Sequence, residues 1–189
     1  MVCGIDEAGR GSLCGSMFVA GVACDQKNAH WLKEIGVKDS KKLSKPKRFE
    51  LASKMQENKG LYTCIVQKSA WEIDTKGLSL CLRESIEEII SHLLGFAKRF
   101  CVDGNTLFGL QGGVGYSLEA IIKGDDKIPQ ISGASILAKT SKDAQMIELD
   151  EQFPQYGFKN NAGYGTSEHL EAIRTYGQTY WHRKSFVIR

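Results

Sequence analysis

The arrangement of apolar and polar residues along the chain predicts a sheet with helices between several of its strands. Three early segments rich in apolar and small residues predict strands over residues 2–6, 17–23 and 61–66. Two later and shorter apolar runs predict strands over residues 100–102 and 118–122. The chain therefore supplies enough strands for one sheet of moderate size.

Helices are predicted from apolar spacing and from start signals. Leu82, Ile86 and Ile90 recur at four-residue intervals, which is typical of one face of a helix. Ser44 followed by Pro46 is a helix-start signal, with Ser44 as the N-cap. In chain order, helices are expected over residues 28–35, 44–58, 79–94, 131–149 and 167–176.

Together these elements predict an α/β fold with a mixed sheet of five strands. An antiparallel meander comes first, and parallel strands with helices on the faces of the sheet follow. The length of 189 residues suits a single domain over residues 1–189, with about residues 160–189 as a helical C-terminal segment.

Acidic residues end or follow three of the predicted strands. Asp6 and Glu7 come at the end of the first strand, and Asp103 and Asp125 follow the last two. Ligand sites gather at the carboxyl ends of parallel strands, so we expect these four side chains to converge. Successive strand residues face opposite sides, so the first strand must end or distort if Asp6 and Glu7 serve one site. Each acid alone is also typical of an ordinary turn.

Converging carboxylates have the chemistry of a site for divalent metal ions. Mg²⁺ and Mn²⁺ prefer oxygen ligands. Two such ions about 4 Å apart form the arrangement used for in-line displacement at phosphorus. Gly9, Arg10 and Gly11 follow the first acids, and a glycine turn exposes N–H groups that can bind a phosphate or a sugar hydroxyl. A dinucleotide-binding loop fits poorly, since it requires glycine at the position of Cys14.

Two further segments carry candidate binding residues. Ser135 and Lys139 lie four residues apart on a predicted helix and share a face. Lys139 can pair with the acids or bind a phosphate, and the sequence leaves both open. Tyr164 lies between Gly163 and Gly165, where a ring is well placed to stack on a sugar or base.

Charge and cysteine content narrow the class of protein. The net charge of +3 permits a nucleic-acid partner, and Lys38–Arg48 concentrates basic residues. The six cysteines form no C-x-x-C pair, which is typical of buried thiols in a reducing compartment. The sequence shows neither a signal peptide nor a long apolar span, so a cytoplasmic protein without membrane contact is expected.

The chain resembles the ribonuclease HII family over nearly its whole length. The resemblance rests on short blocks in a fixed order: IDEAGRG at 5–11, DSKKLS at 39–44, VDGN at 102–105, KGD and ISGASILAK at 123–139, GYGT at 163–166 and, more weakly, HRKSF at 182–186. It implies a ribonuclease H-like fold and cleavage of the RNA strand in RNA–DNA hybrids. It also implies incision 5′ to single ribonucleotides in duplex DNA, leaving a 3′-hydroxyl and a 5′-phosphate, and a role in removing ribonucleotides from DNA.

The resemblance also implies roles for individual residues. The four acids Asp6, Glu7, Asp103 and Asp125 match the catalytic metal ligands of the family, holding two Mg²⁺ or Mn²⁺ ions. Eight residues are implied to bind nucleic acid. Gly9, Arg10 and Gly11 match the turn that reads the ribose 2′-hydroxyl, and Tyr164 matches the ring that stacks on the sugar. The others are Lys41 and Lys42 of a basic loop, and Ser135 and Lys139. The helical C-terminal segment would bind substrate.

The chain departs from the family pattern at several positions. Ser12 and Ser16 stand where proline is frequent, and Lys142 stands where arginine is usual. Asn161-Ala162 replaces the His-Lys pair that often precedes GYGT. Neither a clamp-binding tail after HRKSF nor the additional N-terminal domain of ribonuclease HIII is expected. A monomer is expected.

Two other functions are weighed against a metal-dependent ribonuclease. A non-catalytic nucleic-acid-binding module would use the acids only in structural turns, and it would bind hybrids without cleaving them. A DNA nuclease or junction resolvase of similar fold would have no 2′-hydroxyl to read, so the Gly9–Gly11 turn and the GYGT loop argue against it.

Overall fold

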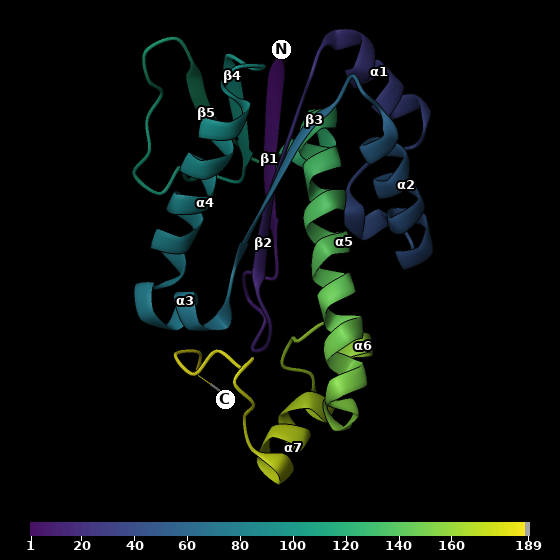
Figure 1. Cartoon of the computed structure of the whole chain (residues 1–189), viewed down its shortest axis with the longest axis vertical. Coiled ribbons are helices and arrows are strands. Elements are labelled where there is room, and N and C mark those ends of the chain that lie inside the picture. The colour runs from purple at the N-terminus through teal and green to yellow at the C-terminus, as the bar shows by residue number, and fades with distance from the viewer. Residues whose placement is uncertain (188–189) are drawn as a thin grey trace.

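The computed structural model describes residues 1–187 and contains one mixed five-stranded sheet in the order β3-β2-β1-β4-β5 (Figure 1). The strands are β1 Val2–Ala8, β2 Met17–Cys24, β3 Tyr62–Lys68, β4 Arg99–Asp103 and β5 Ser117–Ile121. β1, β2 and β3 pair antiparallel, whereas β4 and β5 add in parallel beside β1. The predicted meander with parallel additions is confirmed.

Helices cover both faces of this sheet. The helices are α1 Gln26–Glu34, α2 Lys45–Glu57, α3 Ala70–Lys76, α4 Leu78–Leu93, α5 Pro129–Gln152, α6 Phe158–Asn161 and α7 Ser167–Tyr176, with short 3₁₀ turns η1 Ser40–Lys42, η2 Gly124–Asp126 and η3 Pro154–Tyr156. None of those within residues 1–187 combines the length and apolarity needed to cross a bilayer.

Two apolar cores follow from the alternation of side chains along the strands. Val19 of β2 packs with Ile86 and its neighbours on α4, and Ala20 and Val22 pack on the opposite face with α5 and α2. Figure 1 shows α4 on one side of the sheet and α5 with α1 and α2 on the other. A third core, around Phe158, holds the C-terminal helices against the end of α5.

The start of α5 lies directly against β1 at Gly4. A Cβ atom at Gly4 would come 2.2 Å from the backbone nitrogen of Ile131, so only glycine permits this approach. The contact brings the buried, small-residue stretch of α5 against the strand that carries Asp6. Consequently Ser135 and Lys139 on α5 face the same region as the acids of β1.

The first strand is longer than the sequence predicts. β1 continues through Asp6 and Glu7 to Ala8, with Asp6 opposite Ala20 and Glu7 opposite Val19 on β2. The expectation that the strand ends or distorts at the two acids is therefore wrong. Its pairing with β4 stops at Ile5, so one edge of β1 is open beside the acids.

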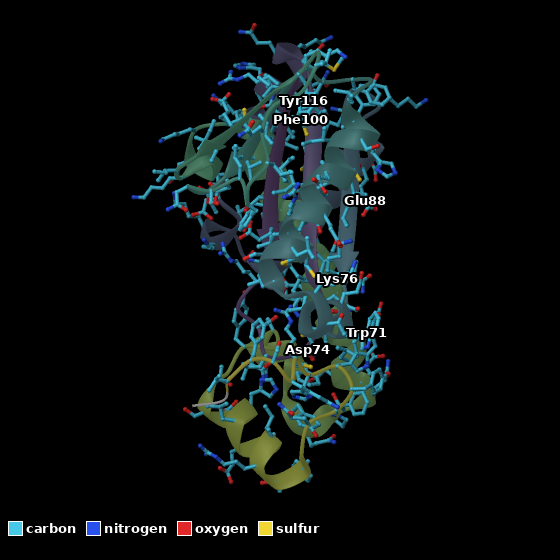
Figure 2. The ribbon with its side chains drawn as sticks, turned by 90° about the vertical axis from the view of Figure 1, so that its left-hand side faces the viewer. Trp71, Asp74, Lys76, Glu88, Phe100 and Tyr116 are labelled. Carbon is cyan, nitrogen blue, oxygen red and sulfur yellow. The ribbon has the colours of Figure 1, made fainter. Side chains whose placement is uncertain are left out.

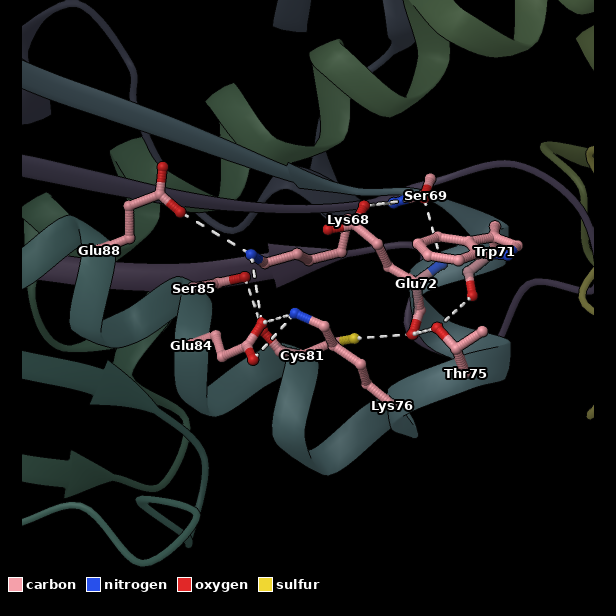
Figure 3. Close-up of polar contacts among 10 residues, drawn as sticks. All are labelled: Lys68, Ser69, Trp71, Glu72, Thr75, Lys76, Cys81, Glu84, Ser85 and Glu88. Atoms are coloured by element: carbon pink, nitrogen blue, oxygen red, sulfur yellow. Dashed lines mark hydrogen bonds and ion pairs between the residues drawn. The ribbon is translucent and has the colours of Figure 1, made fainter.

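Helix α3 is absent from the sequence-based prediction. Ser69 and Glu72 form a capping box at its start, in which each side chain accepts from the backbone N–H of the other (Figure 3). The Ser-x-x-Glu spacing is the signal that could have identified this helix. Figure 3 also shows Lys68 and Lys76 meeting Glu84 of α4, which ties the end of β3 and α3 to that helix.

Candidate active site

A cleft of about 350 Å³ opens where β1 extends past β4. Its walls come from β1 and the following turn, from η1, from the end of β4, from α5 and from the Gly163–Gly165 loop. The lining residues are Asp6, Glu7, Ala8, Gly9, Arg10, Ser40, Lys41, Asp103, Ser135, Lys139 and Tyr164. The structure therefore brings most of the sequence-predicted site residues into one cleft.

Asp6 is the most deeply placed of the acids, with 8% of its surface exposed. Its Oδ1 accepts the backbone N–H of Glu7 at 2.8 Å. Burial, followed by the adjacent Glu7 carboxylate, raises the pKa of Asp6 to about 8. A carboxylate that is costly to ionise in this place gains strongly from a bound cation.

Asp103 links the other acids electrostatically. It raises the pKa values of Asp6, Glu7 and Asp125, in each case after the larger effect of burial. Its Oδ1 accepts the backbone N–H of Gly124 at 2.7 Å, which ties β4 to η2. The acids thus form one interacting group of like charge.

The carboxylates do not form a preorganised metal-binding site. Within residues 1–187, no three acidic, histidine or cysteine side chains are grouped as a metal site. Glu7 turns towards Arg10, with 3.6 Å between Oε1 and Nη1. Asp125 is absent from the cleft lining and lines a second depression with Asp126 and Ser132, so the structure does not bring all four predicted acids into one cleft. The donor set nevertheless consists of oxygen atoms and carries excess negative charge, which fits a hard divalent cation.

Arg10 is held between an acid and an aromatic ring. The guanidinium carbon of Arg10 lies 5.6 Å from the centre of the Phe108 ring. The same guanidinium pairs with the carboxylate of Glu7. Phe108 adopts a left-handed backbone conformation with φ of 54°, which is uncommon for an aromatic residue. The loop after β4 thereby fixes the position of the cation in the Gly9–Gly11 turn.

Lys139 lines the cleft but is tied to its own helix. Its Nζ lies 2.9 Å from Oδ1 of Asp143, whose Oδ2 lies 2.7 Å from Nη2 of Arg48 on α2. Asp143 is buried and serves to join the two cations. Ser135 meets Ser40 of η1, with 2.9 Å between their hydroxyl oxygens.

The two lysines of the basic loop point in different directions. Lys41 lines the cleft, whereas Lys42 lies outside its lining and pairs with Asp126 and Asp39. The ammonium of Lys42 is exposed, and its hydrogen bond to Asp126 raises its pKa.

Tyr164 projects from a loop that is fastened to the Gly9–Gly15 turn. The carbonyl of Gly163 accepts the N–H groups of Leu13 and Cys14 at 2.8 and 3.2 Å. A Cβ atom at Gly11 would lie 4.0 Å from the Tyr164 ring, so Gly11 borders the ring although it is not part of the cleft lining. The partly exposed ring can therefore stack on a group held by the turn.

The departures from the family pattern form buried hydrogen bonds. Ser16 exchanges bonds with Gln145, and Lys142 donates to the carbonyl of Cys14 at 2.8 Å. Burial, then the nearby Arg183 charge, lowers the pKa of Lys142 to about 7. Asn161 bridges the Tyr156 carbonyl and the Gly163 N–H, so its buried side chain shapes the Tyr164 loop.

Sequence reasoning missed three residues of this region: Ser40, Phe108 and Arg183. Ser40 lies inside the DSKKLS block, which was the available signal. Arg183 lies inside HRKSF, and its burial makes it a structural centre of the C-terminal segment. No local pattern in the sequence pairs Phe108 with Arg10.

Comparisons with known proteins identify similar chains. Residues 3–188 match the family model described as Ribonuclease HII. The chain is 50% identical to the ribonuclease HII of Helicobacter acinonychis (strain Sheeba) over 189 residues, covering 100% of this chain and 97% of the relative.

Solved structures show the same fold. The PCNA:RNase HII complex from Archaeoglobus fulgidus matches with a TM-score of 0.81 at 30% identity, covering 97% of this chain and 92% of the other. The ribonuclease H2 from Pyrococcus horikoshii OT3 matches with a TM-score of 0.80 at 26% identity, covering 98% and 93%. The mixed sheet flanked by helices is therefore a ribonuclease H-like fold.

Proposed function

Because this chain belongs to the ribonuclease HII family of metal-dependent endonucleases, we propose that it incises duplex DNA 5′ to single embedded ribonucleotides as well as cutting RNA–DNA hybrids. The products are a 3′-hydroxyl and a 5′-phosphate. Family membership already implies ribonuclease H activity on RNA–DNA hybrids. Incision at single ribonucleotides gives the enzyme its role in removing ribonucleotides from DNA.

One observation carries this proposal: three of the four acids share a cleft with Arg10 of the glycine turn and with the Tyr164 ring. Asp6, Glu7 and Asp103 line one part of it, while Arg10 and Tyr164 line another. A phosphodiester positioned on the acids would place its neighbouring sugar near the Gly9–Gly11 turn and the Tyr164 ring. This juxtaposition suits cleavage that depends on a 2′-hydroxyl next to the scissile bond.

The four acids Asp6, Glu7, Asp103 and Asp125 would hold Mg²⁺ or Mn²⁺. Their oxygen-only chemistry and the raised pKa of Asp6 support this assignment. When bound, such ions activate water and stabilise the leaving oxygen. The protein would contribute the positions of these carboxylates on β1, β4 and η2, and bound cations would favour the deprotonated forms that burial makes costly.

The remaining residues of the cleft would bind and orient the substrate. The Gly9–Gly11 turn offers N–H groups to a ribose hydroxyl, and Tyr164 offers a face for stacking. Lys41, whose ammonium has no ion pair within residues 1–187, is suited to a backbone phosphate. Lys139 is neutralised in part by Asp143, so it would contribute less to phosphate binding.

The test uses a labelled DNA duplex with one internal ribonucleotide, incubated with Mg²⁺ or Mn²⁺. An all-DNA duplex and an RNA–DNA hybrid are incubated in parallel. A single cut 5′ to the ribonucleotide, absent with EDTA and absent from the all-DNA duplex, is expected. Binding of the hybrid without cleavage by either ion would favour a non-catalytic module, and equal cutting of the all-DNA duplex would favour a DNA nuclease.

A further inference from the structure

Arg183 of the C-terminal segment is buried against the main chain of the Arg10–Gly15 turn, with 1% of its surface exposed. Its Nη1 donates to the carbonyl of Arg10 at 2.9 Å. Its Nε and Nη2 both donate to the carbonyl of Gly15, at 3.1 and 2.9 Å. The rigid fork of a guanidinium is suited to bridging two carbonyl groups in this way.

These hydrogen bonds from Arg183 determine the direction of one N–H group in the turn. The peptide between Arg10 and Gly11 is trans, so its carbonyl and its N–H point in opposite directions. With the carbonyl held on Arg183, the Gly11 N–H points away from the buried side of the turn. That N–H meets no acceptor within residues 1–187, and Gly11 borders the Tyr164 ring. It is therefore a free donor beside the stacking residue.

Helix α3 anchors the segment that carries Arg183. Asp74 accepts the backbone N–H groups of Lys184 and Ser185 at 2.8 and 3.0 Å. Figure 2 shows Asp74 where α3 meets the C-terminal segment. On the other side, the Phe186 ring lies 5.1 Å from the Arg183 guanidinium. These contacts fix the position of the arginine from outside the turn.

The preceding residue, His182, supports the Tyr164 loop in parallel. Its Nδ1 accepts the N–H of Thr179 at 2.9 Å, so its proton is on Nε2, which lies 3.1 Å from Nε2 of His169. His169 in turn donates from Nδ1 to the carbonyl of Tyr164 at 2.9 Å. Burial lowers the pKa of His182 to about 4, so this relay is neutral at physiological pH. Adjacent residues of one segment thus support both loops of the cleft.

We propose that Arg183 is a positioning residue for ribose recognition, holding the Arg10 carbonyl so that the Gly11 N–H is presented to the sugar. This inference rests on the ribonuclease function proposed above. Arg183 does not line the cleft, so it acts through the turn. Its loss should weaken the preference for ribose over deoxyribose rather than the general affinity for duplex DNA.

The test compares wild-type protein with Arg183→Lys, which keeps the charge but loses the fork. Arg83→Lys is the matched control, because Arg83 is an exposed residue of α4 that pairs with Glu87 and lies outside the cleft lining. For each protein, kcat and KM are measured on the single-ribonucleotide duplex with Mg²⁺. The all-DNA duplex serves as a competitive inhibitor that gives Ki. The ratio of Ki to KM measures ribose preference and does not depend on the fraction of folded enzyme.

We expect Arg183→Lys to lower this ratio about 3- to 10-fold, the range for one lost hydrogen bond, with Ki nearly unchanged. Arg83→Lys should leave the ratio unchanged. A second variant, Asp74→Asn, loosens the anchor without touching Arg183, and it should lower the ratio by a smaller factor. Amide hydrogen exchange over residues 9–15 should be faster in both Arg183→Lys and Asp74→Asn.

Several outcomes would overturn the positioning role. One is an unchanged ratio in a folded Arg183→Lys protein, and another is an equal rise of KM and Ki, which a merely structural role would produce. If Arg183→Lys fails to fold, Asp74→Asn becomes the test of the positioning role. Faster amide hydrogen exchange over residues 9–15 in Asp74→Asn, together with an unchanged ratio of Ki to KM, would contradict the inference. A wild-type enzyme that cuts no ribonucleotide duplex would instead refute the proposed function, before any variant is compared.

Discussion

Two groups of buried charge border the Gly9–Gly15 turn, and the structure satisfies them in opposite ways. Asp6 and Glu7 precede the turn, and burial raises the pKa of both because few donors compensate their charge. Lys142 and Arg183 lie behind the turn, and their ammonium and guanidinium groups donate to the carbonyls of Arg10, Cys14 and Gly15. Burial disfavours the charged form in both groups, and it lowers the pKa of Lys142 to about 7. The two cations nevertheless donate hydrogen bonds to main-chain oxygens, whereas the acids need a cation from outside the chain.

The difference separates a reactive site from its support. A buried charge without a partner lowers stability and persists where another component, such as a metal ion, supplies the missing charge. A buried cation with several carbonyl partners holds the backbone in place and gains nothing from a substrate. Substitutions in the two groups should therefore have effects of opposite sign on stability and of different kinds on activity.

The largest expected effect is the loss of turnover in Asp6→Asn. An amide cannot replace a carboxylate as a metal ligand in the transition state, so kcat should fall at least ~100-fold on the single-ribonucleotide duplex. Asp25→Asn is the matched control, because Asp25 is the exposed N-cap of α1 and lies outside the cleft lining. Near-normal turnover in Asp6→Asn would contradict the assignment of the acids.

On the side of the cations, Arg183→Met should destabilise the protein by about 2–4 kcal/mol. The carbonyls of Arg10 and Gly15 would lose three donated hydrogen bonds in a buried place. The free energy of unfolding in urea measures the effect. Arg174→Met, at an exposed position, should change stability by no more than about 0.5 kcal/mol. Equal stability of the two variants would show that the hydrogen bonds of Arg183 to the turn do not stabilise the protein.

The acids should make the metal-free protein less stable as the pH rises. The pKa of Asp6 is about 8 in the folded chain, against 3.8 for an unperturbed aspartate, so the folded state binds more protons between these limits. Stability from this group is present below about pH 4 and is lost as the pH rises towards 8. Asp6→Asn should remove this loss, so its Tm in EDTA should exceed that of the wild type by more at pH 8 than at pH 5.

Divalent ions supply the control for this pH dependence. Mg²⁺ or Mn²⁺ should raise the Tm of the wild type at pH 8 and have little effect on Asp6→Asn, because binding to the folded state adds stability. If the Tm difference between the two proteins is the same at pH 5 and pH 8, the ionisation of Asp6 does not lower the stability of the folded chain.

The smallest expected effect concerns the ring that holds Arg10. Phe108→Leu keeps an apolar side chain but removes the face over which the guanidinium lies. A cation–π contact at a partly exposed site is worth about 0.5–1 kcal/mol, so KM should rise about 2- to 5-fold with kcat nearly unchanged. Phe49→Leu, on an exposed face of α2, is the control. A drop in kcat instead would place Phe108 closer to the chemistry.

Much of the fold followed from local patterns in the sequence. The strand and helix positions were predictable because apolar periodicity and caps act over a few residues, as in Ser44-Lys45-Pro46 before α2. The antiparallel meander with parallel additions was predictable from chain connectivity, which allows few arrangements of short connections, whereas the order of the strands came from the structure. The sharing of one cleft by Asp6, Glu7 and Asp103 followed from the same topology, because strand ends meet at one edge. Asp125 was expected to join them, but it lines a second depression.

What the tertiary structure alone decided depends on contacts between distant segments. Arg183 and Arg10 lie 173 positions apart, and no spacing rule joins an arginine near the C-terminus to a carbonyl at residue 10. The turning of Lys42 to Asp126 and the contact of Arg10 with Phe108 are likewise settled by packing. The sequence by itself therefore determined which chemical groups reach the edge of the sheet. Folding decided how each is held, because the partners of buried polar groups are selected only when all the elements are packed together.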